Sequence, residues 1–530
     1  MYPGRILVVD DLPDVRATLS GLLADEGYRV RSAGSLAEAR ELVTTERFHV
    51  AVLDVRLDES DVDNVDGLKL MREIRALDPS VAIIILTGYA NVDIVRQALE
   101  PDNTGRAPAV GFLEKSKIID LLPNVQRVFD TQVRINPDLT IDLPEPIWTQ
   151  LTHRLRFAHL KHPTEACLRE EIDELLRKLF YPCEKITVRP MSRGLGGTAV
   201  LEVIPYYHHR GEGERLITKL GEHILIEREK RNYDELVRGQ IGGHRLPIAL
   251  EEARTHSLAG IIYTFVGQGA SQDFVDFGRT ASTAEVLQAI NNLFLETCLP
   301  WRRGPHEVLH QQDLRDVYFH LLRLNAEKLT SSLDLMMGKR HPFRKNPAGS
   351  GIWLGDQLLV DPVAYVLTAD LRTDSDTSII HGDLNGYNVL VDHHRATWLI
   401  DFANTCRGPL AHDYACFETS IRLDLAADLP LAEALLWEQS LLQADLQRPV
   451  LPPDLAKTPR LAAMHAAVET TRQLAWQAHK GDSERSYLMA LLFNALKLMT
   501  VMNFDPKLRD RTLVTAALIA ARLQANASKS

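Results

Sequence analysis

The sequence predicts an α/β domain with a doubly wound parallel sheet, followed by a larger α+β body of two lobes. Three observations predict this organisation. Short apolar runs alternate with amphipathic helical patterns over residues 1–129, which is typical of a βα repeat. The stretch 130–185 then brings prolines and one helical pattern, and we expect a connector there. Strand-like segments with glycine turns over 186–266 predict a small lobe, and the mainly helical remainder, 267–530, predicts a large one.

The composition is that of a folded protein of several domains. The chain has 530 residues, which at roughly 150 residues per domain suggests about three structural units. It carries 60 Lys and Arg against 71 Asp and Glu, a net charge of −11, which disfavours binding of nucleic-acid phosphates as the main activity. With 45% hydrophobic and 25% charged residues, the composition excludes a disordered or membrane-embedded chain.

The cysteines and the apolar runs favour a reduced, cytoplasmic protein. Five cysteines are scattered without a CxxC pair, which suits neither a disulfide framework nor a zinc site. The N-terminal MYPGRILVVDD reaches two aspartates before a signal-peptide core forms, and no apolar run approaches the ~20 residues of a membrane span. We therefore expect no contact with a membrane.

Polar side chains follow the apolar runs of residues 1–129. The runs Arg5–Val9, Val50–Leu53 and Val81–Leu86 indicate buried parallel strands, and Val15–Glu26 and Leu36–Thr44 indicate helices between them. Ligands of such sheets bind beyond the carboxyl ends of the strands. The polar residues in that position are Asp10, Asp11, Asp54, Thr87 and Lys115.

These residue types suit phosphoryl chemistry. Asp10, Asp11 and Asp54 form an all-oxygen set of the kind that binds Mg²⁺. Asp54, alone on the central strand, is best placed to attack a phosphoryl donor and become an aspartyl phosphate. Lys115 can neutralise phosphoryl oxygens, and the Thr87 hydroxyl can donate to one of them once the adduct has formed.

In this order, the residues resemble the receiver domain of two-component response regulators. The resemblance is carried by the acidic pair, by Asp54 in VLDVRL, by Thr87 in ILTGYA and by Lys115. It implies a flavodoxin-like five-stranded parallel sheet and a histidine kinase or phosphotransfer protein that phosphorylates Asp54. It also implies that Phe112 is an aromatic switch that turns inward with Thr87, and it favours a homodimer.

The segment departs from the receiver pattern in three places. The loop after Asp54 carries extra acidic residues, a second insertion lies around Glu100–Pro108, and Ser116 stands where the family usually has proline. None of these removes a chemical group from the site. We expect a phosphorylatable domain with a modified output face; the alternative is a receiver fold that no longer accepts phosphate.

A second constellation lies in HGDLNGYNVLVD and the following LIDFA. Asn388 follows Asp383 by five residues, and Asp401 comes thirteen later. Phosphoryl transfer needs a carboxylate for the acceptor hydroxyl and oxygen ligands for Mg²⁺ on the nucleotide. Asp383 fits the catalytic role, and Asn388 and Asp401 fit the metal role. A hairpin from Asn388–Asp392 to Thr397–Ile400 would bring the two ligands to one edge.

This motif resembles the catalytic loop of protein kinase-like folds. The sequence segments GDLN and GPLAHDYA resemble the aminoglycoside phosphotransferase and choline kinase branch more than the protein kinases proper. The resemblance implies ATP and Mg²⁺ as cofactors, and it implies that His381 orients the loop and that Asp413 supports it from below. Ala403 replaces the usual glycine of the metal-binding tripeptide.

A kinase-like large lobe requires a nucleotide-binding small lobe upstream. SRGLGGTAVLEV offers a glycine-rich loop for the phosphates, although such a loop is often only a hairpin turn. Lys219 lies in a following strand, with Glu229 of the helix Ile224–Val237 as its expected partner and Glu227 as the second choice. The remaining nucleotide-binding candidates are the loop glycines and the hinge after Ile261–Phe265: Gly194, Gly196, Gly197, Val266 and Gly267.

The sequence therefore predicts a response regulator, phosphorylated on Asp54, whose output is an ATP- and Mg²⁺-dependent phosphotransferase acting on an unknown hydroxyl acceptor. The acceptor site is expected in the helical insertion around Thr283–Thr297 and Asp313–Leu329. The first alternative is an inactive ATP-binding pseudokinase scaffold that binds a protein partner under receiver control. The second is transfer of AMP instead of phosphate.

Overall fold

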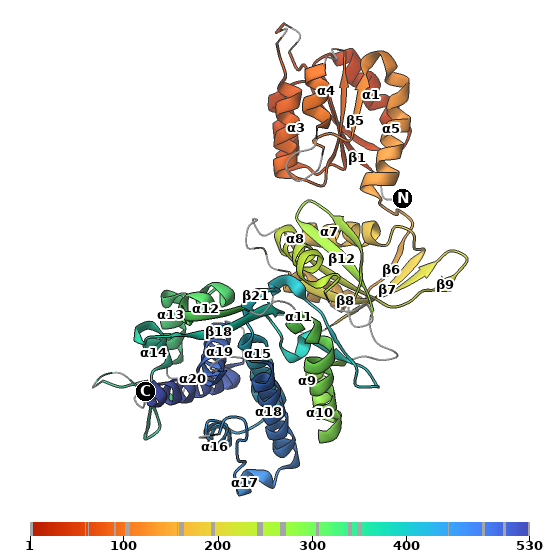
Figure 1. The fold of residues 1–530 in the computed structure, drawn as a ribbon. Coiled ribbons are helices and arrows are strands. Elements are labelled where there is room, and N and C mark those ends of the chain that lie inside the picture. The colour runs from red at the N-terminus through yellow and green to blue at the C-terminus, as the bar shows by residue number, and fades with distance from the viewer. Residues whose placement is uncertain are drawn as a thin grey trace. The chain divides into compact units, whose positions relative to one another are not determined.

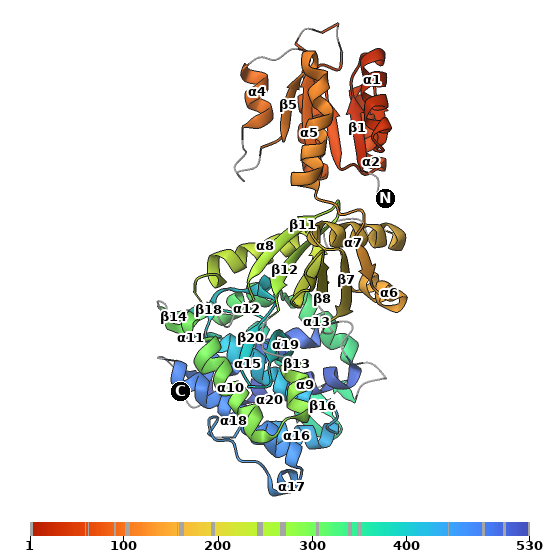
Figure 2. The same ribbon diagram turned by 90° about the vertical axis from the view of Figure 1, so that its right-hand side faces the viewer.

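In the computed structural model the chain forms two compact units (Figures 1 and 2). The first comprises Met1–Glu227 and Ile248–Phe265, and the second comprises Arg228–Pro247 and Val266–Ser530. The residues that the structure describes are 4–58, 60–61, 63–88, 92–100, 107–155, 157, 164–191, 197–240, 247–265, 272–303, 307–337, 342–347, 349, 351–443, 445–479, 483–501 and 505–527.

The first unit begins with a five-stranded parallel sheet in the order β2-β1-β3-β4-β5 (Figure 1). Helices cover both faces, as expected for a doubly wound fold. The strands are β1 (Arg5–Val9), β2 (Arg29–Ala33), β3 (Val50–Leu53), β4 (Ala82–Thr87) and β5 (Gly111–Glu114). The helices are α1 (Pro13–Asp25), α2 (Leu36–Thr45), α3 (Asp66–Leu77), α4 (Val92–Leu99) and α5 (Leu121–Val128).

Alternation along the strands divides the receiver core in two. Leu7 and Val9 of β1 point to the face covered by α2, α3 and α4, whereas Ile6 and Val8 point to the face covered by α1 and α5. Because both faces are covered, β1, β3 and β4 are continuous apolar runs. This sheet fits the expected receiver architecture.

A second sheet completes the first unit, in the order β11-β12-β10-β8-β7-β6, with β9 paired to β8. Helices α6 (Glu145–Arg154) and α7 (Glu165–Leu179) precede most of it in the chain. The strands are β6 (Thr140–Asp142), β7 (Lys185–Pro190), β8 (Ala199–Tyr207), β9 (Gly211–Glu212), β10 (Leu216–Glu222), β11 (Ala249–Arg254) and β12 (Leu258–Thr264).

Residues 130–185, expected as a connector, are built into this second sheet. Strand β6 pairs in parallel with β7, and the apolar side of α7 shares one hydrophobic core with the strands. Gly260 in β12 makes room for the helix, because a Cβ there would lie 2.8 Å from a Leu179 methyl carbon. Thr164 caps α7 as its sequence suggests, accepting a hydrogen bond from the Cys167 amide.

The receiver sheet meets α7 and the β11–β12 turn through a cluster of charged side chains. Arg5 binds Glu174 at 2.9 Å, Arg47 binds Glu171 at 2.7 Å, and the Asp78 carboxylate lies 2.9 Å from Nδ1 of His256. Arg5 begins β1, whereas Arg47 and Asp78 lie in the segments that lead into β3 and β4. These contacts therefore lie at the end of the sheet opposite the carboxyl ends of its strands.

The second unit is mainly helical and carries three small sheets. Helix α8 (His223–Asn232) is divided between the units after Glu227. The three sheets are β13 (Gln272–Asp273), β19 (Val389–Val391) and β20 (Thr397–Leu399); β14 (Glu307–Asp313), β18 (Arg372–Ile380) and β21 (Cys406–Pro409); and β15 (Phe343–Lys345), β16 (Ile352–Leu354) and β17 (Gln357–Leu359).

Its long helices bury one another, and no helix in the described part of the chain has the length and hydropathy for a membrane crossing. The helices are α9 (Phe274–Thr280), α10 (Thr283–Asn292), α11 (Leu299–Arg303), α12 (Leu314–Leu322), α13 (Ala326–Met336), α14 (Pro362–Thr368), α15 (Ala411–Ser420), α16 (Leu431–Leu441), α17 (Pro453–Ala456), α18 (Pro459–Ala478), α19 (Ser483–Met499) and α20 (Pro506–Ala527). Helix α15 is buried along its whole length, against α18 and α19.

Candidate functional site

Three carboxylates meet at the carboxyl ends of β1 and β3. One oxygen from each of Asp10, Asp11 and Asp54 lies within 4.8 Å of the others. Asp10 and Asp54 are buried, and the Asp54 amide donates to the Val9 carbonyl at 2.9 Å, which fixes the two strand ends side by side. Burial raises the pKa of Asp10, and the charge of Asp54 adds to this effect although Lys115 opposes it.

Lys115 joins two of these carboxylates. Its Nζ lies 2.5 Å from Oδ2 of Asp54 and 2.7 Å from Oδ2 of Asp10. Burial would lower the pKa of Lys115, but its hydrogen bonds to Asp10 and Asp54 outweigh burial and raise it. The ammonium group is therefore held charged beside the carboxylate that is expected to attack phosphorus through its other oxygen.

The free oxygen of Asp54 fits a metal ion and a phosphoryl group. Among the described residues, Oδ1 of Asp54 is buried and has no hydrogen-bond partner, while Oδ2 is taken by Lys115. A buried carboxylate oxygen without a donor is costly unless a cation or a proton reaches it. Together with Asp10 and Asp11, it supplies the all-oxygen ligand set that Mg²⁺ prefers.

The other receiver candidates lie around this pocket. Thr87 is fully buried at the end of β4, and Phe112 of β5 is half-buried against the core beside α2, α3 and α4. Gly67 begins α3 so close to the site that a Cβ there would lie 1.8 Å from the Asp54 carbonyl oxygen. In the acidic loop, Asn64 organises the chain by accepting from the amides of Leu57 and Asp66.

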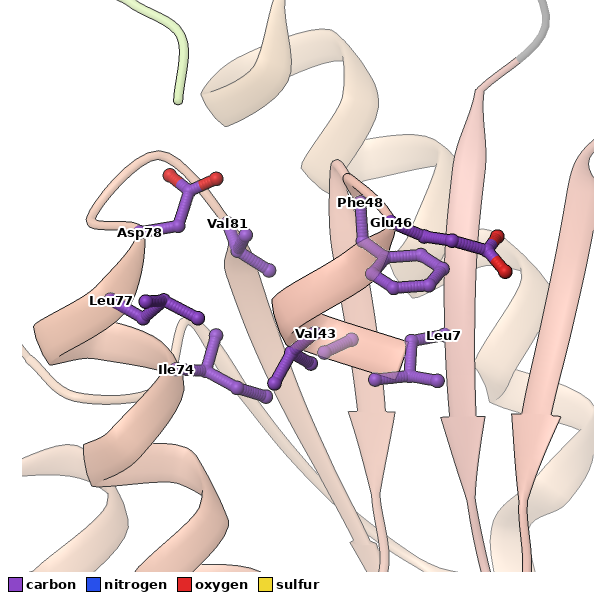
Figure 3. Close-up of a pocket in the computed structure, with 9 residues that line it drawn as sticks. Leu7, Val43, Glu46, Phe48, Ile74, Leu77, Asp78 and Val81 are labelled. Atoms are coloured by element: carbon purple, nitrogen blue, oxygen red, sulfur yellow. The ribbon is translucent and has the colours of Figure 1, made fainter. Parts of the chain in front are cut away.

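A small apolar cavity lies away from this pocket, under α2 and α3 (Figure 3). It is lined by Leu7, Val43, Glu46, Phe48, Ala51, Ile74, Leu77, Asp78 and Val81. Its volume of about 10 Å³ is close to the minimum for one water molecule. It is a packing defect rather than a ligand site.

The second constellation is a hydrogen-bonded loop between β18 and β19. Asn385 Nδ2 donates to Oδ1 of Asp383 at 3.0 Å, and Asn388 Nδ2 donates to the Asp383 carbonyl at 2.8 Å. The Asn385 side chain also caps η5 (Gly386–Asn388) by accepting from two backbone amides. Donation from the Asn388 nitrogen leaves its amide oxygen as the atom that can bind a cation.

Asp413 of helix α15 holds this loop through hydrogen bonds, as expected. Its two carboxylate oxygens accept from the amides of His381 and Gly382, at 2.8 and 3.0 Å. His381 is buried and donates from Nε2 to the Ile400 carbonyl at 3.0 Å, so it ties the loop to the strand that leads to Asp401. Gly382 has φ +77°, and a Cβ there would lie 2.2 Å from the Asn404 oxygen.

Asp401 follows β20 in a left-handed backbone conformation, with φ 70° and ψ 75°. Such a conformation costs a non-glycine residue free energy, and it recurs at functional sites. The Ile400 amide donates to the Asn388 carbonyl at 3.1 Å, which brings both metal-ligand candidates to one edge of the β19–β20 hairpin. Burial, and next the charge of Asp401, raise the pKa of Asp383.

Asn232 and Tyr233 dock on the turn after Asp401, and neither was a candidate from the sequence. Asn232 Nδ2 donates to the carbonyls of Phe402 and Ala403, at 3.2 and 3.1 Å. The Tyr233 and Phe402 rings lie 5.7 Å apart between centroids. Asn385 and His412 were missed as well. The N-G-x-N spacing after Asp383 is a local signal for the Asn385 cap, whereas nothing in the sequence points to Asn232.

The nucleotide-binding candidates are divided between the units. Lys219 is buried in β10, opposite Ile261 of β12, in the first unit, whereas Glu229 is fully buried in α8 within the second unit. Glu227, the second choice, is half-exposed and binds Arg254. Gly197 has φ +79°. Gly194, Gly196, Val266 and Gly267 lie outside the described residues.

Two family models match the chain, one over its N-terminal segment and one over a later segment. The model of the response regulator receiver domain matches residues 6–122. The model of ternary complex associated domain 9 matches residues 184–361 and 344–500, together more than half of the chain.

Three individual relatives each match a quarter of this chain or less. Sporulation initiation phosphotransferase F of Bacillus subtilis is 28% identical over 100 residues, 19% of this chain and 77% of that protein. Nitrogen assimilation regulatory protein NtrX of Azorhizobium caulinodans is 32% identical over 110 residues, 21% of this chain and 22% of that protein. Among solved structures, a CheY-like receiver from Methanospirillum hungatei is 28% identical, covers 25% of this chain and 97% of that chain, and has a TM-score of 0.22. The chain thus spans about a fifth of NtrX.

Proposed function

The chain belongs to the ternary complex associated domain 9 family and carries a response regulator receiver domain, and from this premise we propose a phosphotransferase under receiver control. The receiver is the aspartate-phosphorylated module of two-component regulation. We assign its phosphoacceptor as Asp54. We assign the output as ATP- and Mg²⁺-dependent transfer to a hydroxyl acceptor by a protein kinase-like body. The observation that carries this output is the joined set of Asp383, Asn388 and the left-handed Asp401.

At the receiver, the buried Oδ1 of Asp54 attacks phosphorus in a phosphohistidine of the donor protein. The new bond joins Oδ1 to phosphorus while the phosphorus–nitrogen bond breaks. Asp10, Asp11 and Asp54 would hold Mg²⁺, which would supply charge neutralisation there. Lys115, already 2.5 Å from Asp54, neutralises the phosphoryl oxygens, and Thr87 donates its hydroxyl to one of them.

At the output site, Asp383 orients the acceptor hydroxyl and takes its proton. A raised pKa suits this role, because a general base works best when its pKa approaches the working pH. Asn388 and Asp401 supply oxygen ligands for Mg²⁺ on the nucleotide. Lys219, Glu229 and the glycine-rich loop are the groups proposed to hold the ATP phosphates.

An ATP-binding scaffold without turnover is the second candidate. The carboxylate of Asp383 already accepts from the side chains of Asn385 and Asn388, so its oxygens are occupied in this structure. Ala403 stands at the position of the usual glycine. The family description, with its reference to a ternary complex, also favours a role in binding other proteins.

Transfer from α- and γ-labelled ATP distinguishes the candidate functions. The full chain is incubated with each nucleotide, and label is followed on protein and on small molecules. Transfer of only the γ label supports phosphotransfer, and transfer of only the α label supports AMP transfer. The scaffold predicts that neither label moves. Asp383→Asn should abolish transfer, while Asp356→Asn, in the exposed β16–β17 turn, serves as the matched control.

The metal assignment has a separate test. Asp401→Ala should remove Mg²⁺-dependent ATP binding measured by calorimetry, because an oxygen ligand is lost. Unchanged affinity in this variant would place the metal site elsewhere.

A further inference from the structure

Three cations gather around the end of α19 in the second unit. Lys497 lies in the last turn of α19, Lys328 in the first turn of α13, and Arg323 ends α12. Lys328 Nζ lies 3.5 Å from the Arg323 carbonyl oxygen. Arg323 has φ 52°, a left-handed conformation that arginine seldom adopts. Helices α12 and α13 both pack on α19, and the charges of Lys328 and Arg323 act on Lys497, so the three residues form one electrostatic cluster.

Hydrogen bonds connect the part of α19 near the cluster with the loop that carries Asp383. Asn494, one turn before Lys497 in α19, approaches Nδ1 of His412 at 3.4 Å. Nε2 of the same ring donates to the Gly382 carbonyl, at 3.2 Å. The face of α19 that carries Lys497 is therefore linked through His412 to the residue next to Asp383. Lys497 interacts electrostatically with Lys328, Arg323 and Asp383.

The repulsion among the cations is offset only in part, by the charge of Asp383 acting on Lys497. Within the part of the chain that the structure describes, none of the three forms a salt bridge, and Lys497 is half-buried. Burial, together with Lys328 and Arg323, lowers the pKa of Lys497 to about 8. Like charges kept together without a salt-bridge partner destabilise the fold, and an anion bound among them would offset that cost.

The elements that carry these cations differ from those that carry the metal-ligand candidates. Asn388 and Asp401 lie at the β19–β20 hairpin, whereas the cations come from α12, α13 and α19. Asp383 interacts with both sets, through its hydrogen bond from Asn388 and through the effect of its charge on Lys497. An anion at the cation cluster therefore belongs to the acceptor rather than to the metal-bound nucleotide.

We propose that Arg323, Lys328 and Lys497 bind a phosphate group of the acceptor, so that the acceptor is a hydroxyl compound that already carries phosphate. This inference rests on the proposed phosphotransfer at Asp383. The acceptor hydroxyl oxygen bonds to the γ-phosphorus of ATP, the bond to the bridging oxygen breaks, ADP leaves, and the hydroxyl proton passes to Asp383. Three cations, one of them a forked guanidinium, match the dianionic charge of a phosphate better than a carboxylate.

Protection of Lys497 from acylation tests the anion site directly. At pH 8 the full chain is treated with an amine-acylating reagent, and modification of each lysine is followed by peptide mass spectrometry. Inorganic phosphate should slow the modification of Lys497 and leave Lys507, an exposed lysine at the start of α20, unaffected. Acetate should protect less than phosphate, and choline should not protect. No protection by phosphate, or equal protection of Lys507, would overturn the proposal.

Variants separate the cluster from a nonspecific salt effect. Arg323→Gln and Lys328→Gln should each raise the phosphate concentration for half-protection of Lys497 about tenfold or more, as expected for loss of one charged hydrogen bond. Lys507→Gln should leave that concentration unchanged. Unchanged half-protection in both cluster variants would contradict the assignment.

Label transfer then distinguishes this inference from the function on which it rests. With γ-labelled ATP, glycerol 3-phosphate should accept label faster than glycerol, and Lys497→Gln should remove the difference whereas Lys497→Arg should keep it. Equal transfer to both acceptors, without phosphate protection of Lys497, would overturn the acceptor assignment and leave the phosphotransferase standing. Phosphate protection without any transfer would contradict the phosphotransferase and support the anion site.

Discussion

Lys115 holds Asp10 and Asp54 at the same time, while Oδ1 of Asp54 keeps no partner among the described residues. One carboxylate oxygen is thereby fixed and the other is left for chemistry. Asp54→Asn should abolish labelling of the full chain by labelled acetyl phosphate, because an amide is not a nucleophile for phosphorus. Asp58→Asn, in the exposed loop that follows, should label like the wild type. Persistent labelling of Asp54→Asn would place the phosphoacceptor on another residue.

Replacement of glycine by alanine should have opposite effects on the stability of the receiver at two positions. Gly67→Ala would place a Cβ 1.8 Å from the Asp54 carbonyl oxygen, so it should destabilise the receiver by ~1–3 kcal/mol. Gly21→Ala lies on the exposed side of α1 with nothing within 4 Å, so it should stabilise the receiver by roughly 0.5–1 kcal/mol. Denaturant unfolding of the full chain measures both. Equal stability of the two variants would show that α3 does not approach Asp54 this closely.

The sequence predicts some of these residues well because their position depends on local order. Asp10, Asp54 and Lys115 each follow a strand of a parallel sheet, and such strand ends meet at one edge whatever the rest of the chain does. Asn232 is different, since its hydrogen bonds reach Phe402 and Ala403, 170 and 171 residues away. No local pattern encodes a contact of that range.

At the scale of elements, α7 was expected as part of a connector. It packs on the second sheet, and two of its acidic residues bind arginines of the receiver. Its spacing of apolar residues predicts a helix and the buried face, which packs on β12. Its opposite, charged side carries Glu171 and Glu174, which the sequence alone would leave solvated. Both are buried, because Arg5, Arg47 and Lys178 bind them.

The His256–Asp78 pair predicts how the stability of the first unit depends on pH. The hydrogen bond to Asp78 raises the pKa of His256, although burial opposes this. The stabilisation that the charged His256 gives the folded state is complete below the ordinary histidine pKa of 6.5. It is lost as pH rises through the raised pKa. Burial would raise the pKa of Asp78, but the bonds from His256 and Ser80 lower it, so its contribution is lost as pH falls through a value below 3.8.

His256→Gln should therefore destabilise the first unit most between about pH 4 and 6.5, and less at pH 8 and above. The expected loss is about 0.5–1 kcal/mol, since the ring is partly exposed and solvent screens the pair. Scanning calorimetry of the full chain across pH measures it, with His153→Gln, an exposed histidine of α6, as the control. A difference that grows with rising pH would contradict the assigned pair.

At the scale of the whole molecule, part of the acidic excess behind the net charge of −11 lies at two sites. Asp10, Asp11 and Asp54 lie within one pocket, and Asp383 and Asp401 raise the local negative charge at the other. The receiver pocket suits Mg²⁺ and a phosphoryl group, and we propose the same chemistry for the second site. The cations around Lys497, which form no salt bridge among the described residues, are the proposed site for an anionic acceptor.

The most direct measurement of the account is transfer of γ-label from ATP by the full chain, with and without prior treatment with acetyl phosphate. Receiver-controlled phosphotransfer predicts label transfer that Asp383→Asn lowers by about 10²-fold or more, as expected for loss of a general base. It also predicts that acetyl phosphate changes the wild-type rate and leaves the rate of Asp54→Asn unchanged. Absence of γ-label transfer in the wild type, or equal transfer by Asp383→Asn, would contradict a receiver-controlled phosphotransferase.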